Sequence, residues 1–282
     1  MPQFESYDGT TIAYRVLGDG PPLVCLPGGP GRAAEYLGNL GGLDQARQLV
    51  LPDPRGVGAS ADPVDPATFR ADRLVDDVES VRAHLGVERM DLLAHSAGAI
   101  LATLYAAAYP QRLSRLLLIT PGLGPVGVDV AEEEFTALIE NRAAQPWYPA
   151  ARAALAKLES GDQTLPTFFA ARPLFYGRWD EAAEAHSRLG VAERHAAHRH
   201  GFFDGLELDV PVVKAGLAKL SAPVLLYAGD EDPLVTPAMI NEAAASFGDP
   251  TVLVQPGAGH FPWIDDGASF SAAVGAFLSQ PG

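Results

Sequence analysis

The sequence predicts a doubly wound α/β fold, built on a mostly parallel sheet with a helical segment inserted into it. Short continuous apolar runs, the pattern of strands buried on both faces, alternate with segments of helical periodicity. Such alternation is typical of an open parallel sheet covered by helices on both sides. The alternation stops between about residues 122 and 217, where helical sequence occurs without clear strand runs.

The order of elements begins with a hairpin. The first residues alternate and turn at Asp8-Gly9, and residues 11–16 indicate a strand. Parallel strands are then expected at residues 22–26, 48–51, 90–94, 115–119, 223–228 and 251–254, and helices at residues 72–85, 97–109, 237–247 and 268–278. We therefore expect a core formed by residues 1–121 and 218–282, with residues 122–217 as a helical cap.

The composition excludes several classes of protein. With 48% hydrophobic and 20% charged residues, the chain is typical of a globular domain. A net charge of -15 argues against a nucleic acid or an anionic membrane as partner, because phosphate-binding surfaces concentrate Lys and Arg. The sequence shows neither a signal peptide nor a run of apolar residues long enough to span a membrane, so we expect a cytoplasmic protein.

A serine stands where a strand is expected to run into a helix. Residues 90–94 lead directly into His95-Ser96-Ala97-Gly98, which is the strand, turn and helix context of a nucleophile elbow. Small residues are needed two positions before and after the serine, and Ala94 and Gly98 meet that need. Ser96 is therefore the candidate nucleophile. The alternative is that it only caps the helix.

A base and an acid for this serine follow in loops after later strands. A serine hydroxyl is a poor nucleophile unless a base takes its proton and an acid orients that base. His260 follows the last expected strand, and Asp230 and Asp232 both follow the strand before it. The spacing does not choose between the two aspartates. His95 is a weaker candidate base, because adjacent residues on an elbow point apart.

Two backbone amides are candidates for an oxyanion hole. The amide of Ala97 directly follows the nucleophile. The second donor is expected from Gly29, in the loop Pro27-Gly28-Gly29-Pro30-Gly31 that follows the first parallel strand. Glycines let such a loop approach a ligand closely.

With these motifs in this order, the chain resembles the α/β-hydrolase superfamily, and within it the proline iminopeptidase-like branch. The resemblance is carried by the glycine loop, the elbow, and the segments Asp53-Pro54-Arg55-Gly56-Val57-Gly58-Ala59-Ser60, Gly229-Asp230-Glu231-Asp232 and Gly259-His260. That branch usually has His, Gln and Gly where this chain has Pro27, Pro54 and Ala94. The resemblance implies an α/β-hydrolase fold and a triad of Ser96, His260 and Asp232, with Asp232 rather than Asp230 as the acid.

These features predict a serine hydrolase of the carboxylesterase or aminopeptidase type. It would cleave a small ester, a lactone or an N-terminal aminoacyl bond through an acyl-enzyme. One alternative is a C–C bond hydrolase or perhydrolase that uses the same triad. Another is a non-catalytic homologue that binds a ligand. The expected partner is a small-molecule substrate, and the triad requires neither a cofactor nor a metal.

The expected cap is rich in aromatic residues, which can line an apolar pocket, although we expect most of them to pack the cap against the core. The resemblance implies that cap glutamates hold a substrate amino group, and the candidates are Glu132, Glu133, Glu134, Glu181 and Glu184.

Two further features invite chemistry that we consider weaker. His195 and His198 would share a helix face and suggest a metal site, but no carboxylate lies nearby at a recognised ligand spacing, so a solvated helix face is expected. Cys25 lies in an apolar run, where a buried thiol is expected rather than a nucleophile. Arg55 is expected to brace its loop by hydrogen bonds.

Overall fold

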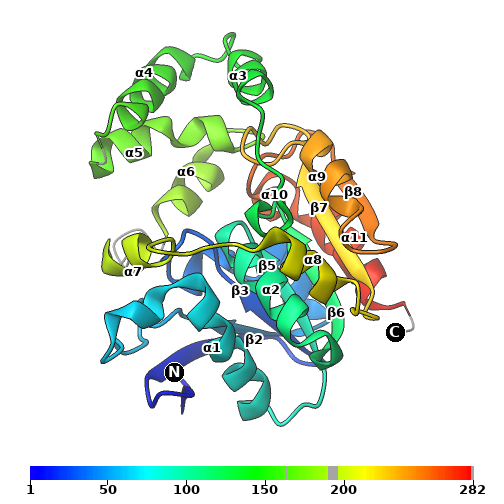
Figure 1. The fold of residues 1–282 in the computed structure, drawn as a ribbon. Helices are drawn as coiled ribbons and strands as arrows, with labels where there is room; N and C mark the ends of the chain where they lie inside the picture. The colour runs from blue at the N-terminus through cyan, green and yellow to red at the C-terminus, as the bar shows by residue number, and fades with distance from the viewer. Residues whose placement is uncertain (163, 190–195, 281–282) are drawn as a thin grey trace.

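The computed structural model describes residues 1–162, 164–189 and 196–280 and confirms the predicted α/β fold (Figure 1). Within these residues, eight strands form one sheet in the order β1-β2-β4-β3-β5-β6-β7-β8. The two N-terminal strands, β1 (Gln3–Glu5) and β2 (Thr11–Leu17), pair antiparallel. The remaining strands run parallel: β3 (Pro22–Leu26), β4 (Gln48–Pro52), β5 (Met90–His95), β6 (Leu113–Ile119), β7 (Val224–Gly229) and β8 (Thr251–Gln255).

The predicted strands are present, but one of them is not buried as expected. The opening hairpin pairs Phe4 with Ile12, as the turn at residues 8–9 predicts. In β8, by contrast, Val254 is 39% exposed. The expectation of burial on both faces is wrong for this strand, because β8 is the last strand of the sheet and has a neighbour on one side only.

Helices cover both faces of the sheet and enclose two separate apolar cores. One face carries α1 (Ala71–His84), α2 (Ala97–Ala108), α8 (Val210–Leu217) and α9 (Pro237–Ala244). The other carries α10 (Pro262–Asp265), α11 (Gly267–Leu278) and the 3-10 segment Leu40–Gln45. Successive strand residues point to opposite faces. Leu92 of β5 therefore joins the first core, and Leu93 joins the second.

The described residues between β6 and β7 are helical, in agreement with the sequence pattern. They form α3 (Glu132–Glu140), α4 (Tyr148–Glu159), α5 (Leu165–Ala171), α6 (Glu181–Arg188), α7 (Ala196–Gly201) and α8. Figure 1 shows α3, α4 and α5 standing apart from the sheet, and these three share a small core of their own. The last helix, α8, packs against α2 instead, where Gly216 leaves room for the backbone of Ala107. The division at residues 122 and 217 stays a prediction.

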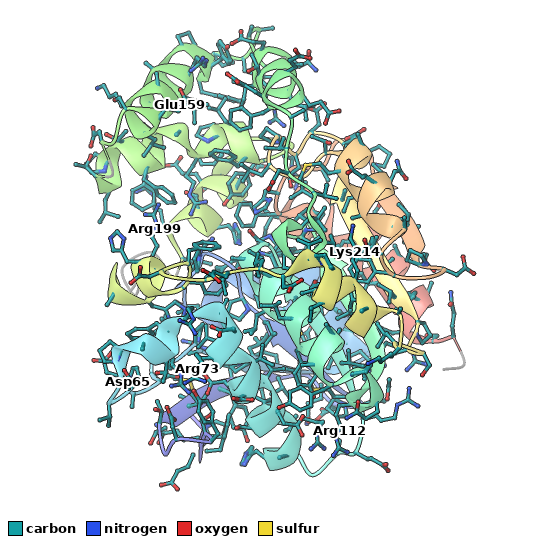
Figure 2. The ribbon with its side chains drawn as sticks, viewed as in Figure 1. Asp65, Arg73, Arg112, Glu159, Arg199 and Lys214 are labelled. Carbon is teal, nitrogen blue, oxygen red and sulfur yellow. The ribbon has the colours of Figure 1, made fainter. Side chains whose placement is uncertain are left out.

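The surface is strongly charged. Side chains such as Asp65, Arg73, Glu159 and Lys214 are exposed and point away from the body of the molecule (Figure 2). Of the helices in the described ranges, none is both long enough and apolar enough to cross a membrane.

Cys25 lies fully buried in β3, between β4 and β5. Burial raises the pKa of its thiol well above the ordinary value. A thiol in this position stays protonated at neutral pH, and the thiolate is the nucleophilic form. The expectation of an inert buried thiol is thus consistent with its surroundings.

A buried ion-pair cluster ties the loop after β4 to α1 and to the opening hairpin. Arg55 is fully buried, and its guanidinium donates to Asp77 Oδ2 at 2.8 Å and to Asp8 Oδ2 at 2.7 Å. Burial, the largest single influence, would lower the pKa of Arg55, but the hydrogen bonds and charges of Asp77 and Asp8 together outweigh it and raise that pKa. This arrangement agrees with the expected bracing role of Arg55.

We expect Asp77→Asn to destabilise the protein by about 3 kcal/mol, because it removes a counter-charge from a buried guanidinium. The control is Asp72→Asn, which breaks the pair between Arg70 and Asp72. Those two side chains are 35% and 45% exposed, and an exposed pair contributes about 1 kcal/mol or less. Urea unfolding of both variants measures the difference. Equal losses of unfolding free energy in the two variants would show that the buried cluster contributes no more to stability than the exposed pair.

Candidate active site

Ser96 occupies a tight turn between β5 and α2. Its φ and ψ angles are 52° and -121°, a conformation that residues other than glycine rarely adopt. The turn is held by two backbone hydrogen bonds: the Ser96 amide donates to the Ile119 carbonyl at 3.1 Å, and the Ser96 carbonyl accepts from the Gly122 amide at 3.0 Å. This is the backbone geometry that the nucleophile-elbow prediction requires.

Two glycines allow neighbouring segments to close on this turn. A Cβ atom at Gly98 would lie 2.5 Å from the Pro27 carbonyl oxygen, and one at Gly28 would lie 2.8 Å from the Ser96 Cβ. Both distances are too short for any side chain. The loop after β3 therefore lies directly against Ser96 and the start of α2.

The structure brings Ser96, His260 and Asp232 together in one hydrogen-bonded row. His260 Nε2 lies 2.9 Å from Ser96 Oγ, and His260 Nδ1 lies 2.8 Å from Asp232 Oδ2. Asp232 is fully buried, and its other oxygen accepts from the Leu234 amide at 2.9 Å. Because an ionised carboxylate can only accept, Nδ1 carries the hydrogen in this row. Nε2 of the neutral ring is then an acceptor for the Ser96 hydroxyl.

The neighbouring aspartate lies elsewhere. Asp230 is exposed, and its carboxylate accepts from the Gly257 amide at 2.6 Å. The geometry therefore favours Asp232 for the contact with His260, a choice that spacing alone leaves open.

His95 is not placed to act on Ser96. It is buried, its Nδ1 lies 2.7 Å from the Tyr36 hydroxyl, and its Nε2 lies 2.8 Å from the His260 carbonyl oxygen. Burial, together with the neighbouring His260, lowers the pKa of His95 well below its usual range. Both ring nitrogens are thus engaged away from the Ser96 hydroxyl.

The glycine loop and the start of α2 flank the Ser96 side chain. The Gly28 amide donates to the Tyr36 hydroxyl at 2.6 Å, so it is already engaged. The next amide of the loop is that of Gly29, and Ala97 is the first residue of α2. Amides at a helix N-terminus favour negative charge. That Gly29 and Ala97 form an oxyanion hole stays a prediction.

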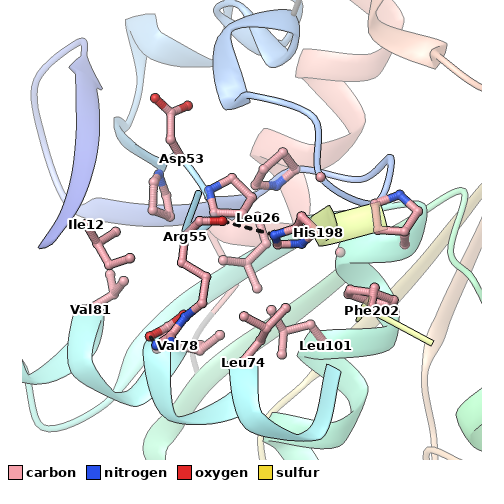
Figure 3. A pocket seen from close by; sticks show the side chains of 18 residues that line it. Ile12, Leu26, Asp53, Arg55, Leu74, Val78, Val81, Leu101, His198 and Phe202 are labelled. Carbon is pink, nitrogen blue, oxygen red and sulfur yellow. Dashed lines mark hydrogen bonds and ion pairs between the residues drawn. The ribbon is translucent and has the colours of Figure 1, made fainter. Parts of the chain in front are cut away.

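A small apolar cavity lies beside the elbow (Figure 3). It has a volume of about 50 Å³, and its lining includes Ala97, Leu26, Leu101 and Phe202. A buried water needs about 10–15 Å³ on this measure, whereas whole ligand pockets are many times larger. The cavity is too small for an entire substrate, and its lining includes Ala97 but neither Ser96 nor His260.

The structure describes one of the two cap histidines that were considered as metal ligands. His195 lies outside the described residues. His198 is 1% exposed, its Nδ1 lies 3.0 Å from the Arg55 carbonyl oxygen, and its ring packs on Phe69 and Phe202. The expectation of a solvated face is therefore wrong at His198, because α7 packs on the core there. Within the described ranges, no three His, Cys, Asp or Glu side chains are grouped as metal ligands.

The glutamates considered for binding an amino group are not buried in a site. Glu132, Glu133, Glu181 and Glu184 are exposed, and Glu184 pairs with Arg188 at 2.9 Å. Glu134 is partly buried and accepts from the Thr236 hydroxyl at 2.7 Å. This arrangement gives no support to an amine-binding role for the five.

Two residues of the site were not anticipated from the sequence. Tyr36 contacts both Gly28 and His95, and the Thr120 hydroxyl donates to the His260 carbonyl at 3.1 Å. Thr120 directly follows β6, and carboxyl ends of strands are where sites form in such sheets, so its position was a usable signal. Tyr36 lies in a mixed polar and apolar stretch that gave no comparable signal.

The fold and this geometry define an α/β hydrolase, and comparison with known proteins agrees. A family model described as the alpha/beta hydrolase fold matches residues 21–267, so the chain belongs to the α/β-hydrolase family. The predicted resemblance to proline iminopeptidases is also confirmed. The chain is 26% identical to the proline iminopeptidase of Lactobacillus helveticus (strain DPC 4571), over 96% of this chain and 95% of that one.

Solved structures share the fold. An esterase from Exiguobacterium antarcticum has a TM-score of 0.74 at 18% identity, over 99% of both chains. An enol-lactonase from Burkholderia xenovorans LB400 has a TM-score of 0.68 at 19% identity, over 99% of this chain and 100% of that one. The family match and the proline iminopeptidase relative, rather than these structures, show that the chain is an enzyme of the hydrolase class.

A second buried histidine predicts how stability depends on pH. His186 Nδ1 lies 2.8 Å from the Tyr176 hydroxyl, and its Nε2 lies 2.8 Å from the Tyr36 carbonyl oxygen. Burial, followed by the charge of Arg32, lowers the pKa of His186 to about 3. The unfolded chain therefore binds a proton first as the pH falls below about 6.5, and the native state loses about 1.4 kcal/mol per pH unit at this residue.

Lowering the pH from about 7 to about 5 should reduce the free energy of unfolding of both proteins. We expect the reduction to be about 2 kcal/mol smaller in His186→Gln than in wild type, because glutamine does not titrate. Urea unfolding at both pH values measures this difference, whatever the change in stability at pH 7. The control is His200→Gln at an exposed position of α7, which should keep the wild-type slope. An unchanged slope in His186→Gln would contradict the assignment of a neutral buried histidine.

Proposed function

We propose that this protein is a cytoplasmic serine hydrolase that cleaves small esters or lactones through an acyl-enzyme. The observation that carries the proposal is the row from Ser96 Oγ to His260 Nε2 at 2.9 Å and from His260 Nδ1 to Asp232 at 2.8 Å. A nucleophile, a base and a residue that orients the base are the three parts of this chemistry.

In the first step, Ser96 Oγ attacks the substrate carbonyl carbon, and His260 Nε2 takes the hydroxyl proton. Asp232 holds the Nδ1 hydrogen, keeps the ring in the reactive tautomer and stabilises the imidazolium that forms. The C–O bond to the leaving group then breaks, and the imidazolium returns its proton to the leaving oxygen. Water attacks the acyl-serine by the same route, and the acid product leaves.

The amides of Gly29 and Ala97 would stabilise the negative oxygen of each tetrahedral intermediate. The close contact between Gly28 and Ser96 supports this role, because it holds the loop beside the nucleophile. Donors that are already in place need no rearrangement as charge develops, and one such donor contributes about 10²–10³ in rate.

Proteins of the same fold favour an ester or a lactone as the substrate. The esterase and the enol-lactonase with the same fold are named for such substrates. We further propose that residues 122–217 form the cap over this site, as the sequence predicts.

A second candidate is cleavage of an N-terminal aminoacyl bond. The full-length similarity to a proline iminopeptidase favours it. The exposed cap glutamates weigh against it, since a peptide amine needs a buried partner of opposite charge. C–C bond hydrolysis and perhydrolysis would use the same row, and product analysis separates them from ester cleavage.

We expect Ser96→Ala to lower turnover of a short-chain p-nitrophenyl ester by at least about 10³-fold, because it removes the nucleophile. The measurement compares this ester with prolyl and alanyl p-nitroanilides, for wild type and Ser96→Ala. A fluorophosphonate should label wild type at Ser96 and leave the variant unlabelled.

Ser221→Ala, at an exposed position, is the control and should match wild type. Cleavage of anilides that depends on Ser96 would replace the ester assignment by the aminopeptidase one. Full ester turnover in Ser96→Ala would refute the mechanism. Ligand binding without labelling at Ser96 would indicate a non-catalytic homologue.

We expect Asp232→Asn to lower kcat by about 10³–10⁴-fold, because an amide cannot hold the reactive tautomer of His260. Asp230→Asn is the matched control, two residues away on the same loop. Its kcat should stay within about threefold of wild type, because the Asp230 carboxylate accepts from the Gly257 amide and not from His260. Steady-state kinetics on the ester measures both. The reverse order of effects would exchange the two assignments.

A further inference from the structure

A chain of buried hydrogen bonds runs behind the elbow and joins the glycine loop to His260. The Gly28 amide donates to the Tyr36 hydroxyl at 2.6 Å, and that hydroxyl lies 2.7 Å from His95 Nδ1. His95 Nε2 in turn lies 2.8 Å from the His260 carbonyl oxygen. Tyr36 and His95 are 1% and 2% exposed, so water does not compete for these bonds.

The chain can be satisfied in only one direction. The His260 carbonyl accepts, so His95 Nε2 must carry a hydrogen. His95 is neutral because burial lowers its pKa, so its Nδ1 has no hydrogen and must accept. The Tyr36 hydroxyl therefore donates to Nδ1, and its oxygen accepts from the Gly28 amide. Every donor in the chain has one acceptor, which fixes the orientation of both side chains.

The two ends of this chain lie beside two parts of the proposed catalytic site. Gly28 precedes Gly29 and touches Ser96, and the carbonyl of His260 belongs to the base. The Thr120 hydroxyl adds a second bond to that carbonyl at 3.1 Å. Since the oxyanion amide and the imidazole must hold fixed places relative to Ser96 Oγ, a link between their backbones sets the distance between them.

We propose that Tyr36 and His95 are positioning residues of the hydrolysis reaction, which hold the oxyanion loop and the backbone of His260 at the separation that the transition state requires. This inference rests on the proposed function. Neither side chain is placed to touch the reacting atoms, because the Tyr36 hydroxyl and both nitrogens of His95 are engaged in the chain.

Packing alone is the competing explanation. Both rings lie in an aromatic cluster with Phe261 and Trp263. Tyr36→Phe separates the two explanations, because it keeps the ring and removes only the hydroxyl. The matched control is Tyr227→Phe. The Tyr227 hydroxyl is also buried and donates to Gln255 Oε1 at 2.6 Å, but it has no link to Ser96 or His260 side chains.

We expect Tyr36→Phe to lower kcat on the ester by roughly 10- to 100-fold while KM changes less than about threefold, because a displaced oxyanion donor affects the transition state more than substrate binding. Tyr227→Phe should keep kcat within about twofold. His95→Asn should show a similar loss of kcat. The double variant should lose no more than about the worse single variant, because both belong to one chain.

Nitrogen-15 NMR of the wild-type histidines tests the chain without reference to activity. We expect His95 to be the Nε2–H tautomer and to stay neutral at about pH 6, below the usual histidine pKa of about 6.5. A protonated ring or the Nδ1–H tautomer would overturn the inference, and this result is obtained even if a variant fails to fold.

The positioning inference would also be overturned if Tyr36→Phe kept the wild-type kcat, or if the losses of kcat in the double variant were additive. If wild-type turnover does not depend on Ser96, the proposed function fails and not the hydrogen-bond chain. If turnover depends on Ser96 while Tyr36→Phe behaves like Tyr227→Phe, the positioning inference alone fails.

Discussion

Ser96 holds a backbone conformation that costs an L residue about 1–3 kcal/mol, and the structure around it keeps it there. The Ser96 amide donates a hydrogen bond to the carbonyl of Ile119 in β6, and the Ser96 carbonyl accepts one from the amide of Gly122 after β6. The glycine loop and α2 then close on the turn to distances that no side chain would permit. If the turn relaxed, the hydroxyl would leave Nε2 of His260, and the glycine loop would lose the neighbour that fixes its position.

The positions of Asp232 and His260 depend on the helical segment as well as on the sheet. Burying the carboxylate of Asp232 is unfavourable unless it is paired, and His260 and the Leu234 amide supply the partners. Arg142, after α3, donates to the carbonyls of Glu231 and Tyr176. The His260 amide donates to the carbonyl of Phe175. Both loops are thus fastened to the inserted segment, so substitutions in that segment can alter the contacts among Ser96, His260 and Asp232 without touching these residues.

The sequence predicted the core because its signals are local. Apolar runs, the small residues around Ser96, and polar loops after strands report backbone geometry that one segment determines largely by itself. The choice between Asp230 and Asp232 was not local, since it depends on which carboxylate turns toward a histidine 28 positions along the chain from Asp232. The burial of His198 could not be predicted either, because α7 has to dock on the core before that ring is covered.

The same distinction between local and non-local signals explains why the hydrogen bond between Tyr36 and His95 was not predicted. A single tyrosine in a mixed stretch indicates no particular role, and a histidine beside a nucleophile suggests a base. Their connection appears only when the loop after β3, the end of β5 and the loop after β8 meet. The proline iminopeptidase resemblance gave no help there, because it was carried by glycines and by the residues predicted to be catalytic.

The chain contains one cysteine, Cys25, at the centre of the sheet. Alkylating reagents attack the thiolate, and this thiol points into the second core, where Leu37 and Leu40 belong to the covering layer. A reagent must therefore wait for this core to open, and its rate of reaction reports how often that happens. Cys25 is thus a built-in probe of this opening. Its alkylation rate can be compared between wild type and every site variant without adding a label.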